Sequence, residues 1–300
     1  MVAFVEGAVR VSVPATSANL GPGYDSLGLA LDLRDRLEAE VLAEGLVVEV
    51  QGAGADDVPL DESHLVVRSM RAAFDACGGQ PSGLRLSCTN VIPHARGLGS
   101  SSAAIVGGLA LARALVVDGE RLLDDDALFG LAARLEGHPD NVAPAAHGGF
   151  VISGQEDGEF YAVGSPVDAS IGVVVFVPPT AVSTEVARGL LPAQVPHAEA
   201  AADAGRTALL VAALAGRPDQ LWRATRDYLH QDYRRPAMPE SLALVDALRA
   251  DGVAAVVSGA GPTVLAFRVE DGDDDALLAR APEGWAALPL AVDHDGVRAG

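Results

Sequence analysis

The sequence predicts an α+β protein built from two domains. Predicted strands often follow one another directly instead of alternating strictly with helices. The length of 300 residues suits one large domain or two ordinary ones. Hydrophobic residues make up 49% of the chain, enough for cores that need no disulfides. We place the domain boundary within residues 150–165 and divide the chain into 1–155 and 156–300.

The first half is expected to begin with strands. Residues 9–13 alternate apolar and polar side chains, and Pro14 is expected to close this strand. Residues 37–41 and 46–50 are separated by a short Ala-Glu-Gly-containing turn and resemble a hairpin. The remaining predicted elements are a helix over 62–76, a strand over 84–89, helices over 100–117 and 124–136, and a strand over 148–153.

The second half repeats this mixture of strands and helices. Residues 171–177 form a strongly apolar run, typical of a buried strand. Two later strands, over 253–258 and 263–269, are joined by a glycine-rich turn and resemble a hairpin. The other predicted elements are helices over 184–191, 198–215 and 241–250, an acidic helix from Asp273, and a strand over 288–292.

The charged residues exclude several classes of enzyme. The formal net charge is −20, and all 21 basic residues are arginines. A Walker-type P-loop and a protein kinase both need a lysine near the phosphates of the nucleotide. Schiff-base chemistry needs a lysine amine. None of these mechanisms is available to this chain.

Other features limit the partners and the location of the protein. The acidic balance and the lack of arginine clusters argue against a nucleic-acid partner. Cys77 and Cys88 have no CxxC spacing, so a disulfide framework and a structural zinc site are not expected. No signal peptide or long apolar segment is apparent, which predicts a cytoplasmic protein without a membrane partner.

Residues 92–104 carry the strongest functional signal, with the sequence Ile-Pro-His-Ala-Arg-Gly-Leu-Gly-Ser-Ser-Ser-Ala-Ala. A strand is expected to end here and a helix to begin within the serine run. Glycines let the backbone approach a ligand, and a helix N-terminus offers unpaired amides that suit a phosphate. A serine hydroxyl in the first turn could also bind Mg²⁺.

This segment resembles the phosphate-binding signature of the GHMP kinases, the family of galacto-, homoserine, mevalonate and phosphomevalonate kinases. Residues 13–28 and 257–263 resemble the family's N-terminal and C-terminal motifs. The resemblance implies an N-terminal domain like ribosomal S5 domain 2 and a ferredoxin-like C-terminal domain. It also implies that ATP is bound by Pro93, Arg96, Gly97, Leu98, Gly99, Ser100, Ser101, Ser102 and Ala103.

Within the family, residues 15–23 and 136–144 are most similar to the members that phosphorylate homoserine. The resemblance therefore implies ATP-dependent phosphorylation of the side-chain hydroxyl of L-homoserine in threonine biosynthesis. Two residues depart from the pattern. Tyr24 occupies a position where phenylalanine is expected, and His64 lies where related kinases often carry an asparagine near the adenine. The adenine contacts are therefore left unassigned.

L-Homoserine carries a carboxylate and an ammonium group, so its pocket needs charges of both signs. By resemblance, Asn19 and Asp25 face the substrate, and a carboxylate there could hold the ammonium group. Arg188 and Arg234 are the candidates for the substrate's carboxylate, because a guanidinium pairs two N–H donors with it. Arg235 is left open as an alternative to Arg234.

Residues 136–141 form a tight polar loop that is broken by glycine and proline. Glu136 is expected to complete a Mg²⁺ site with Ser101, and the resemblance makes His138 a substrate contact. Asn141 is assigned a catalytic positioning role, and Asp140 is left open as a general base, since phosphoryl transfer depends mainly on positioning and charge neutralisation. Gly259, in the C-terminal motif, is expected to contact the substrate across the cleft between the domains.

Two alternatives stay open at this point. One is another GHMP kinase of the mevalonate type, although mevalonate lacks an ammonium group and does not call for Asp25 with two arginines. The other is a nucleotide-binding regulator without catalytic turnover. The sequence leaves the oligomeric state open, with a homodimer as one option.

Overall fold

The computed structural model describes residues 2–269 and 274–300. In these ranges the strands are β1 (Val9–Asn19), β2 (Gly23–Leu42), β3 (Gly45–Gly52), β4 (Gly83–Asn90), β5 (Phe150–Glu156), β6 (Glu159–Ser165), β7 (Ile171–Val177), β8 (Ala255–Val257), β9 (Val264–Val269), β10 (Ala286–Leu290) and β11 (Arg298–Ala299). The α-helices are α1 (Leu65–Cys77), α2 (Ser100–Leu115), α3 (Gly119–Leu122), α4 (Asp125–Glu136), α5 (Val142–His147), α6 (Thr184–Gly189), α7 (His197–Leu214), α8 (Leu221–Ala224), α9 (Pro239–Ala250) and α10 (Asp274–Leu278). Two 3₁₀ helices, η1 (Pro218–Gln220) and η2 (Asp232–Ala237), connect α7, α8 and α9.

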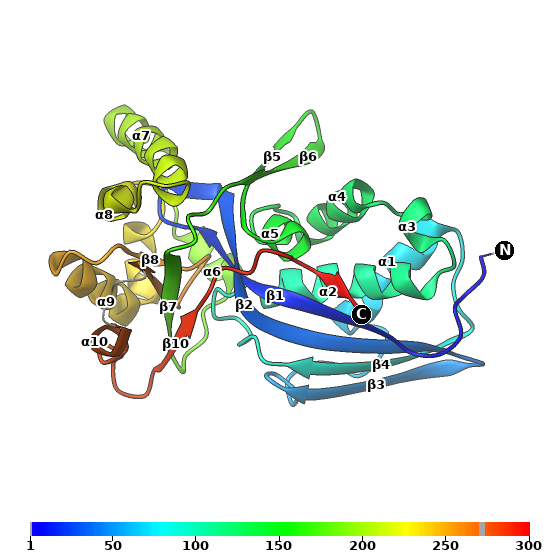
Figure 1. Cartoon of the computed structure of the whole chain (residues 1–300). Helices are drawn as coiled ribbons and strands as arrows, with labels where there is room; N and C mark the ends of the chain where they lie inside the picture. The colour runs from blue at the N-terminus through cyan, green and yellow to red at the C-terminus, as the bar shows by residue number, and fades with distance from the viewer. Residues whose placement is uncertain (1, 270–273) are drawn as a thin grey trace.

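The first sheet has the strand order β11-β1-β2-β4-β3, and β5 and β6 extend it from β2. Helices α1 to α5 lie on one face of the β1–β4 portion (Figure 1). The hairpin predicted over residues 37–50 is wrong, because β4 lies between β2 and β3 and pairs with both. Pro14 also does not end β1, since the strand continues to Asn19 after a register shift at Pro14/Ala15.

The second sheet has the order β10-β7-β9-β8 and lies at the other end of the molecule with α7 to α10 (Figure 1). The antiparallel pairing of β8 with β9 confirms the predicted hairpin there. The C-terminal segment then returns to the first sheet, where β11 pairs with β1. A mostly buried ion pair between Arg34 and Asp293 holds this C-terminal segment against the first sheet.

The other predicted elements agree with the structure to within a few residues, because their caps are local. Gly78, in the left-handed conformation, ends α1, and the Asp124 carboxylate caps α4 by accepting from the Ala127 amide. Residue 273, where the acidic helix was predicted to begin, lies outside the described residues, and α10 is described from Asp274. No helix in the described ranges is long and apolar enough to cross a membrane.

The division at residues 155/156 stays a prediction. In the structure this point lies at the end of β5, which pairs with β6, and the strands of the second sheet begin at Ile171. A large apolar core spans the first sheet, its helices and one face of the second sheet. A smaller core lies between the other face of the second sheet and α9.

Three turns from distant parts of the sequence meet between the two sheets. The Gly259 amide donates to the Ala18 carbonyl at the end of β1, at 3.1 Å. The Ser258 hydroxyl donates to the carbonyl of Gly97, at 2.6 Å, in the loop before α2. A Cβ on Gly97 would lie 2.2 Å from the Ser258 carbonyl oxygen, so only glycine allows the loop and the turn to approach this closely.

Candidate active site

A cavity of about 310 Å³ opens where these three turns meet. Most of the predicted site residues line it, although they come from β1, the loop before α2, the loop after α4, α6, η2 and the β8–β9 turn. The predicted residues on its wall are Asn19, Gly97, Gly99, Ser100, Ser101, Glu136, His138, Asp140, Asn141, Arg188, Arg234 and Gly259. The structure therefore brings together residues separated by up to 240 positions in the sequence.

The N-terminus of α2 forms one wall of this cavity. Gly99 precedes the helix with φ +68°, and the helix begins without a side-chain cap or an acidic residue in its first turn. The first helical amide with a backbone partner belongs to Ala103, which donates to the Gly99 carbonyl at 2.9 Å. By helix geometry the amides of Ser100, Ser101 and Ser102 lack intrahelical partners. Their dipoles favour an anion at this wall.

Glu136, the last residue of α4, lies against this helix start. The Ser101 hydroxyl donates to Glu136 Oε1 at 2.5 Å, and the Ser102 hydroxyl donates to the same oxygen at 2.9 Å. Among the described residues there is no group of three or more His, Cys, Asp or Glu side chains that could hold a metal. The Ser101–Glu136 pair suits Mg²⁺, which usually takes one or two protein oxygens and completes its shell with phosphate and water.

The loop after α4 holds three polar side chains in a fixed arrangement. Asp140 Oδ1 lies 2.7 Å from His138 Nδ1 and accepts the Asn141 amide at 2.9 Å. Burial lowers the pKa of His138, but the hydrogen bond and charge of Asp140 outweigh it and raise that pKa above its usual value. Thr16, which the sequence did not single out, donates its hydroxyl to Asn141 Oδ1 at 2.8 Å. Thr16 therefore orients the Asn141 amide.

The two predicted arginines have different surroundings. Arg188 makes a bidentate ion pair with Asp25, at 2.7 and 3.0 Å, and this hydrogen bonding raises the pKa of Arg188. Arg234 is only 1% exposed, and burial lowers its pKa. It donates to the Gly259 carbonyl at 3.1 Å, and its Nε has no partner in the described part of the chain.

Arg235, left open as an alternative to Arg234, points elsewhere. It pairs with Asp232 at 2.7 Å and Asp246 at 2.9 Å, is about 40% exposed, and is not among the described residues of the cavity wall. The structure therefore favours Arg234 over Arg235 as a cavity residue.

Several predicted residues are not among the described residues of this wall. Asp25 is one of them, and its carboxylate is paired with Arg188. The Arg96 guanidinium points away and donates to the carbonyls of Pro178 and Pro179. The others outside the 310 Å³ wall are Pro93, Leu98, Ser102 and Ala103. Ser183 and Thr184, at the start of α6, also line the cavity, whereas only Arg188 of this segment was predicted as a site residue.

A second cavity of about 260 Å³ lies beside the first and shares Ser100 and Ser101 with it. Its wall combines apolar side chains such as Val58 and Pro59 with His64 and Asn90. His64 is 5% exposed, and its Nδ1 has no partner among the described atoms. Burial lowers the pKa of His64, so a neutral imidazole faces this cavity.

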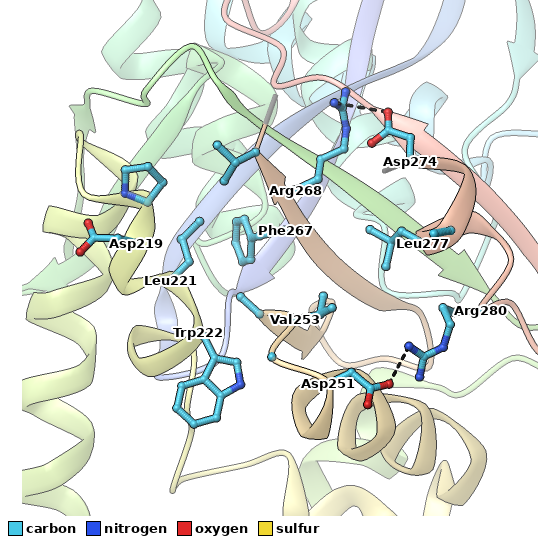
Figure 2. A pocket seen from close by; sticks show the side chains of 15 residues that line it. Asp219, Leu221, Trp222, Asp251, Val253, Phe267, Arg268, Asp274, Leu277 and Arg280 are labelled. Atoms are coloured by element: carbon cyan, nitrogen blue, oxygen red, sulfur yellow. Dashed lines mark ion pairs between the residues drawn. The ribbon is translucent and has the colours of Figure 1, made fainter. Parts of the chain in front are cut away.

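A third cavity, of about 570 Å³, lies in the second half of the chain. Figure 2 shows Leu221 and Trp222 on one side of it and the Arg268–Asp274 and Arg280–Asp251 ion pairs on the other. No predicted site residue is among the described residues of its wall. The chemistry-bearing residues therefore gather at the first two cavities.

The sequence matches two profiles of known protein families. One is described as GHMP kinases N terminal domain and covers residues 64–149, and the other is described as GHMP kinases C terminal and covers residues 209–287. Together they cover more than half of the chain. The chain belongs to the GHMP kinase family.

Its curated relatives carry a more specific name. Homoserine kinase of Streptomyces avermitilis is 56% identical, over 98% of this chain and 96% of the relative. Homoserine kinase of Rhodococcus opacus is 46% identical, over 97% of this chain and 96% of the relative. The crystal structure of homoserine kinase from Cytophaga hutchinsonii has a TM-score of 0.85 at 25% identity and covers 99% of both chains. These matches confirm the predicted resemblance and the two-domain α+β fold.

Proposed function

We propose that this protein transfers the γ-phosphoryl group of ATP to the side-chain hydroxyl of L-homoserine and forms O-phospho-L-homoserine, a step of threonine biosynthesis. The observation that carries the proposal is the composition of the 310 Å³ cavity. A helix N-terminus with unpaired amides lies on one wall, and Arg188 and Arg234 lie on another. Relatives 46% and 56% identical over nearly the whole chain are homoserine kinases.

ATP would span the two neighbouring cavities. Its phosphates suit the amides at the start of α2, because those amides and the helix dipole favour negative charge. The shared residues Ser100 and Ser101 connect this site to the 260 Å³ cavity, where apolar walls and the unpartnered His64 Nδ1 suit a nucleoside. This arrangement needs no lysine, which agrees with the composition of the chain.

Mg²⁺ would be held by Ser101 and Glu136, whose oxygens already lie 2.5 Å apart. When bound, the ion would neutralise charge on the β- and γ-phosphates of ATP. Ser101→Ala and Glu136→Gln are each expected to raise the Mg²⁺ concentration needed for half-maximal rate. An unchanged Mg²⁺ dependence in both variants would remove these residues from the metal site.

The acceptor would occupy the part of the cavity between the loop after α4 and the arginines. Its carboxylate is expected to bind Arg188 and Arg234, and its ammonium group to bind Asp25 once Arg188 has turned toward the carboxylate. His138, Asn19 and Gly259 complete this wall. The orientation of the Asn19 side chain is fixed, because its Nδ2 donates to the Gly259 carbonyl at 2.9 Å.

We assign no essential base to the transfer. Asn141, held by Thr16 at 2.8 Å, positions the reacting groups. The proton of the alcohol passes to the transferred phosphate, while Asp140 Oδ1 is occupied by His138 and the Asn141 amide. Asp140→Asn is expected to keep kcat within about tenfold, whereas a loss of about 1,000-fold or more would make Asp140 the base.

The test is ADP formation from Mg-ATP with L-homoserine, mevalonate, galactose or no acceptor. We expect turnover with homoserine well above that with the other acceptors. ADP formation that does not depend on homoserine, or a preference for mevalonate, would contradict the proposal, and no turnover with any acceptor would favour a regulator. The cytoplasmic location and the homodimer stay predictions.

A further inference from the structure

Tyr24 packs against the two arginines of the 310 Å³ cavity. It is not among the described residues of the cavity wall, yet it contacts both guanidinium groups. Arg188 Nη1 donates to the Tyr24 hydroxyl at 3.0 Å. The guanidinium carbons of Arg188 and Arg234 lie 5.7 and 5.6 Å from the centroid of the Tyr24 ring.

His230 fixes the ring of Tyr24 and one of the arginines. The two rings lie 5.2 Å apart at a tilt of 34°. His230 Nδ1 lies 3.0 Å from Arg234 Nη1, and His230 Nε2 lies 2.7 Å from the Gly21 carbonyl oxygen. Since a guanidinium and a carbonyl have fixed roles, Nδ1 accepts and Nε2 donates. The imidazole is therefore neutral, in line with the burial that lowers the pKa of His230.

Two guanidinium groups this close to one ring repel each other unless something offsets their charge. The face of an aromatic ring is negative and attracts cations, so one tyrosine can stabilise both. Burial raises the pKa of Tyr24, and the charge of Asp25 raises it further, so the phenol keeps its proton. Tyr24 thus supplies an attractive surface and a polar atom without adding a charge.

We propose that Tyr24 is a positioning residue that holds Arg188 and Arg234 side by side as a receptor for the carboxylate of the acceptor. This assignment rests on the proposed function. The hydrogen bonds described for Arg188 go to two partners, the Asp25 carboxylate and the Tyr24 hydroxyl. When an ammonium group takes over Asp25, the Tyr24 hydroxyl still holds Arg188.

The test compares Tyr24→Phe, which removes the hydroxyl, with Tyr24→Leu, which also removes the ring. Tyr24→Phe is expected to raise the KM for L-homoserine about threefold to tenfold, the effect of losing one ordinary, partly exposed hydrogen bond. The kcat and the KM for ATP should change less than about twofold, since the phosphate wall is not touched. Tyr24→Leu is expected to raise the KM for homoserine about tenfold further, because both cation–π contacts are lost.

A second acceptor separates positioning from general damage. 3-Amino-1-propanol has the hydroxyl and the ammonium group of homoserine but no carboxylate, and it is measured as a substrate or as a competitive inhibitor of homoserine. Tyr24→Phe should lower the preference for homoserine over this amine by the same factor that raises the KM. Tyr228→Phe is the matched control, because the Tyr228 ring also carries an arginine, Arg226, at 5.2 Å but is not among the described residues of the cavity wall.

The kinetics of the variant and of the wild-type protein test different claims. If Tyr24→Phe has the homoserine KM of the control, or loses affinity for homoserine and the amine equally, the assignment of Tyr24 is overturned. That result leaves the proposed function intact as long as the wild-type protein phosphorylates homoserine. If the wild-type protein shows no homoserine-dependent turnover, the proposed function fails and the assignment that rests on it fails too.

Discussion

Gly99→Ala tests whether the loop before α2 needs glycine for its approach to the rest of the site. Gly99 has φ +68°, and a Cβ there would lie 1.9 Å from Thr16 Oγ1. The substitution therefore has two separate consequences. The new side chain adopts a left-handed backbone conformation, and it displaces the hydroxyl that orients Asn141.

Both consequences can be given a magnitude. An L-residue in the left-handed region costs about 1–2 kcal/mol. Loss of the Thr16–Asn141 hydrogen bond adds about 1 kcal/mol. The sum of about 2–3 kcal/mol corresponds to a fall in kcat/KM for ATP of roughly 30- to 150-fold, if the loop relaxes by turning the Ser100 and Ser101 amides away from the cavity.

The assay is kcat/KM for ATP at saturating homoserine, with the melting temperature measured alongside. Gly158→Ala is the matched control, because Gly158 has φ +87° and no atom within 4 Å of its ideal Cβ. It should lower the Tm by about 2–4 °C per kcal/mol of backbone strain and leave the kinetics unchanged. If Gly99→Ala has a kcat/KM for ATP within twofold of this control, the reasoning about the loop is refuted.

Three further predictions concern charge and burial. Burial raises the pKa of Asp203 to about 6. The pKa of Asp203 in the unfolded chain is near 3.9, so ionisation of this carboxylate costs stability as the pH rises from that value through 6. Asp203→Asn should raise the free energy of unfolding, measured in urea at pH 7.5, by up to about 3 kcal/mol, and this gain should shrink as the pH falls through 6. A loss of stability at pH 7.5 would contradict this. Arg234→Gln should raise the KM for homoserine about 100-fold or more because it removes a buried charge, whereas Arg235→Gln should leave it within about twofold because exposed ion pairs contribute little; equal effects would exclude Arg234 from the acceptor site. The raised pKa of His138 adds stability below about pH 6.5, and this stability is lost as the pH rises through the pKa of the folded protein. Asp140→Asn should lower the pKa of His138 below 6.5, which an NMR titration of the imidazole would show. An unchanged pKa would mean that a group other than Asp140 raises it.

The parts of the fold that the sequence predicts well are those decided by neighbouring residues. The start of α2 depends on Gly99 and the serine run, and the end of α1 depends on Gly78, so both can be predicted locally. The pairing of β4 between β2 and β3 depends on where the chain returns after α1, and no local pattern encodes it. The return of the C-terminus through the Arg34–Asp293 pair is a contact of the same long-range kind.

The site shows the same division. The motifs predict which residues gather, since each motif is a contiguous stretch with recognisable turn and cap residues. They do not predict that Arg188 pairs with Asp25, because these residues are 163 positions apart. They also gave no way to choose between Arg234 and Arg235, which burial decides. Thr16 lies within the N-terminal motif of residues 13–28, but its hydrogen bond to Asn141 is apparent only from the structure.

The central claim is that the cavity between the two sheets phosphorylates the hydroxyl of homoserine. Identification of the product by ³¹P NMR, after incubation with Mg-ATP and L-homoserine, tests it most directly. The account predicts one phosphomonoester whose phosphorus couples to the protons of the homoserine side-chain CH₂, formed in equal amount to ADP. Inorganic phosphate as the main product, or phosphorus bound anywhere other than that hydroxyl oxygen, would contradict it.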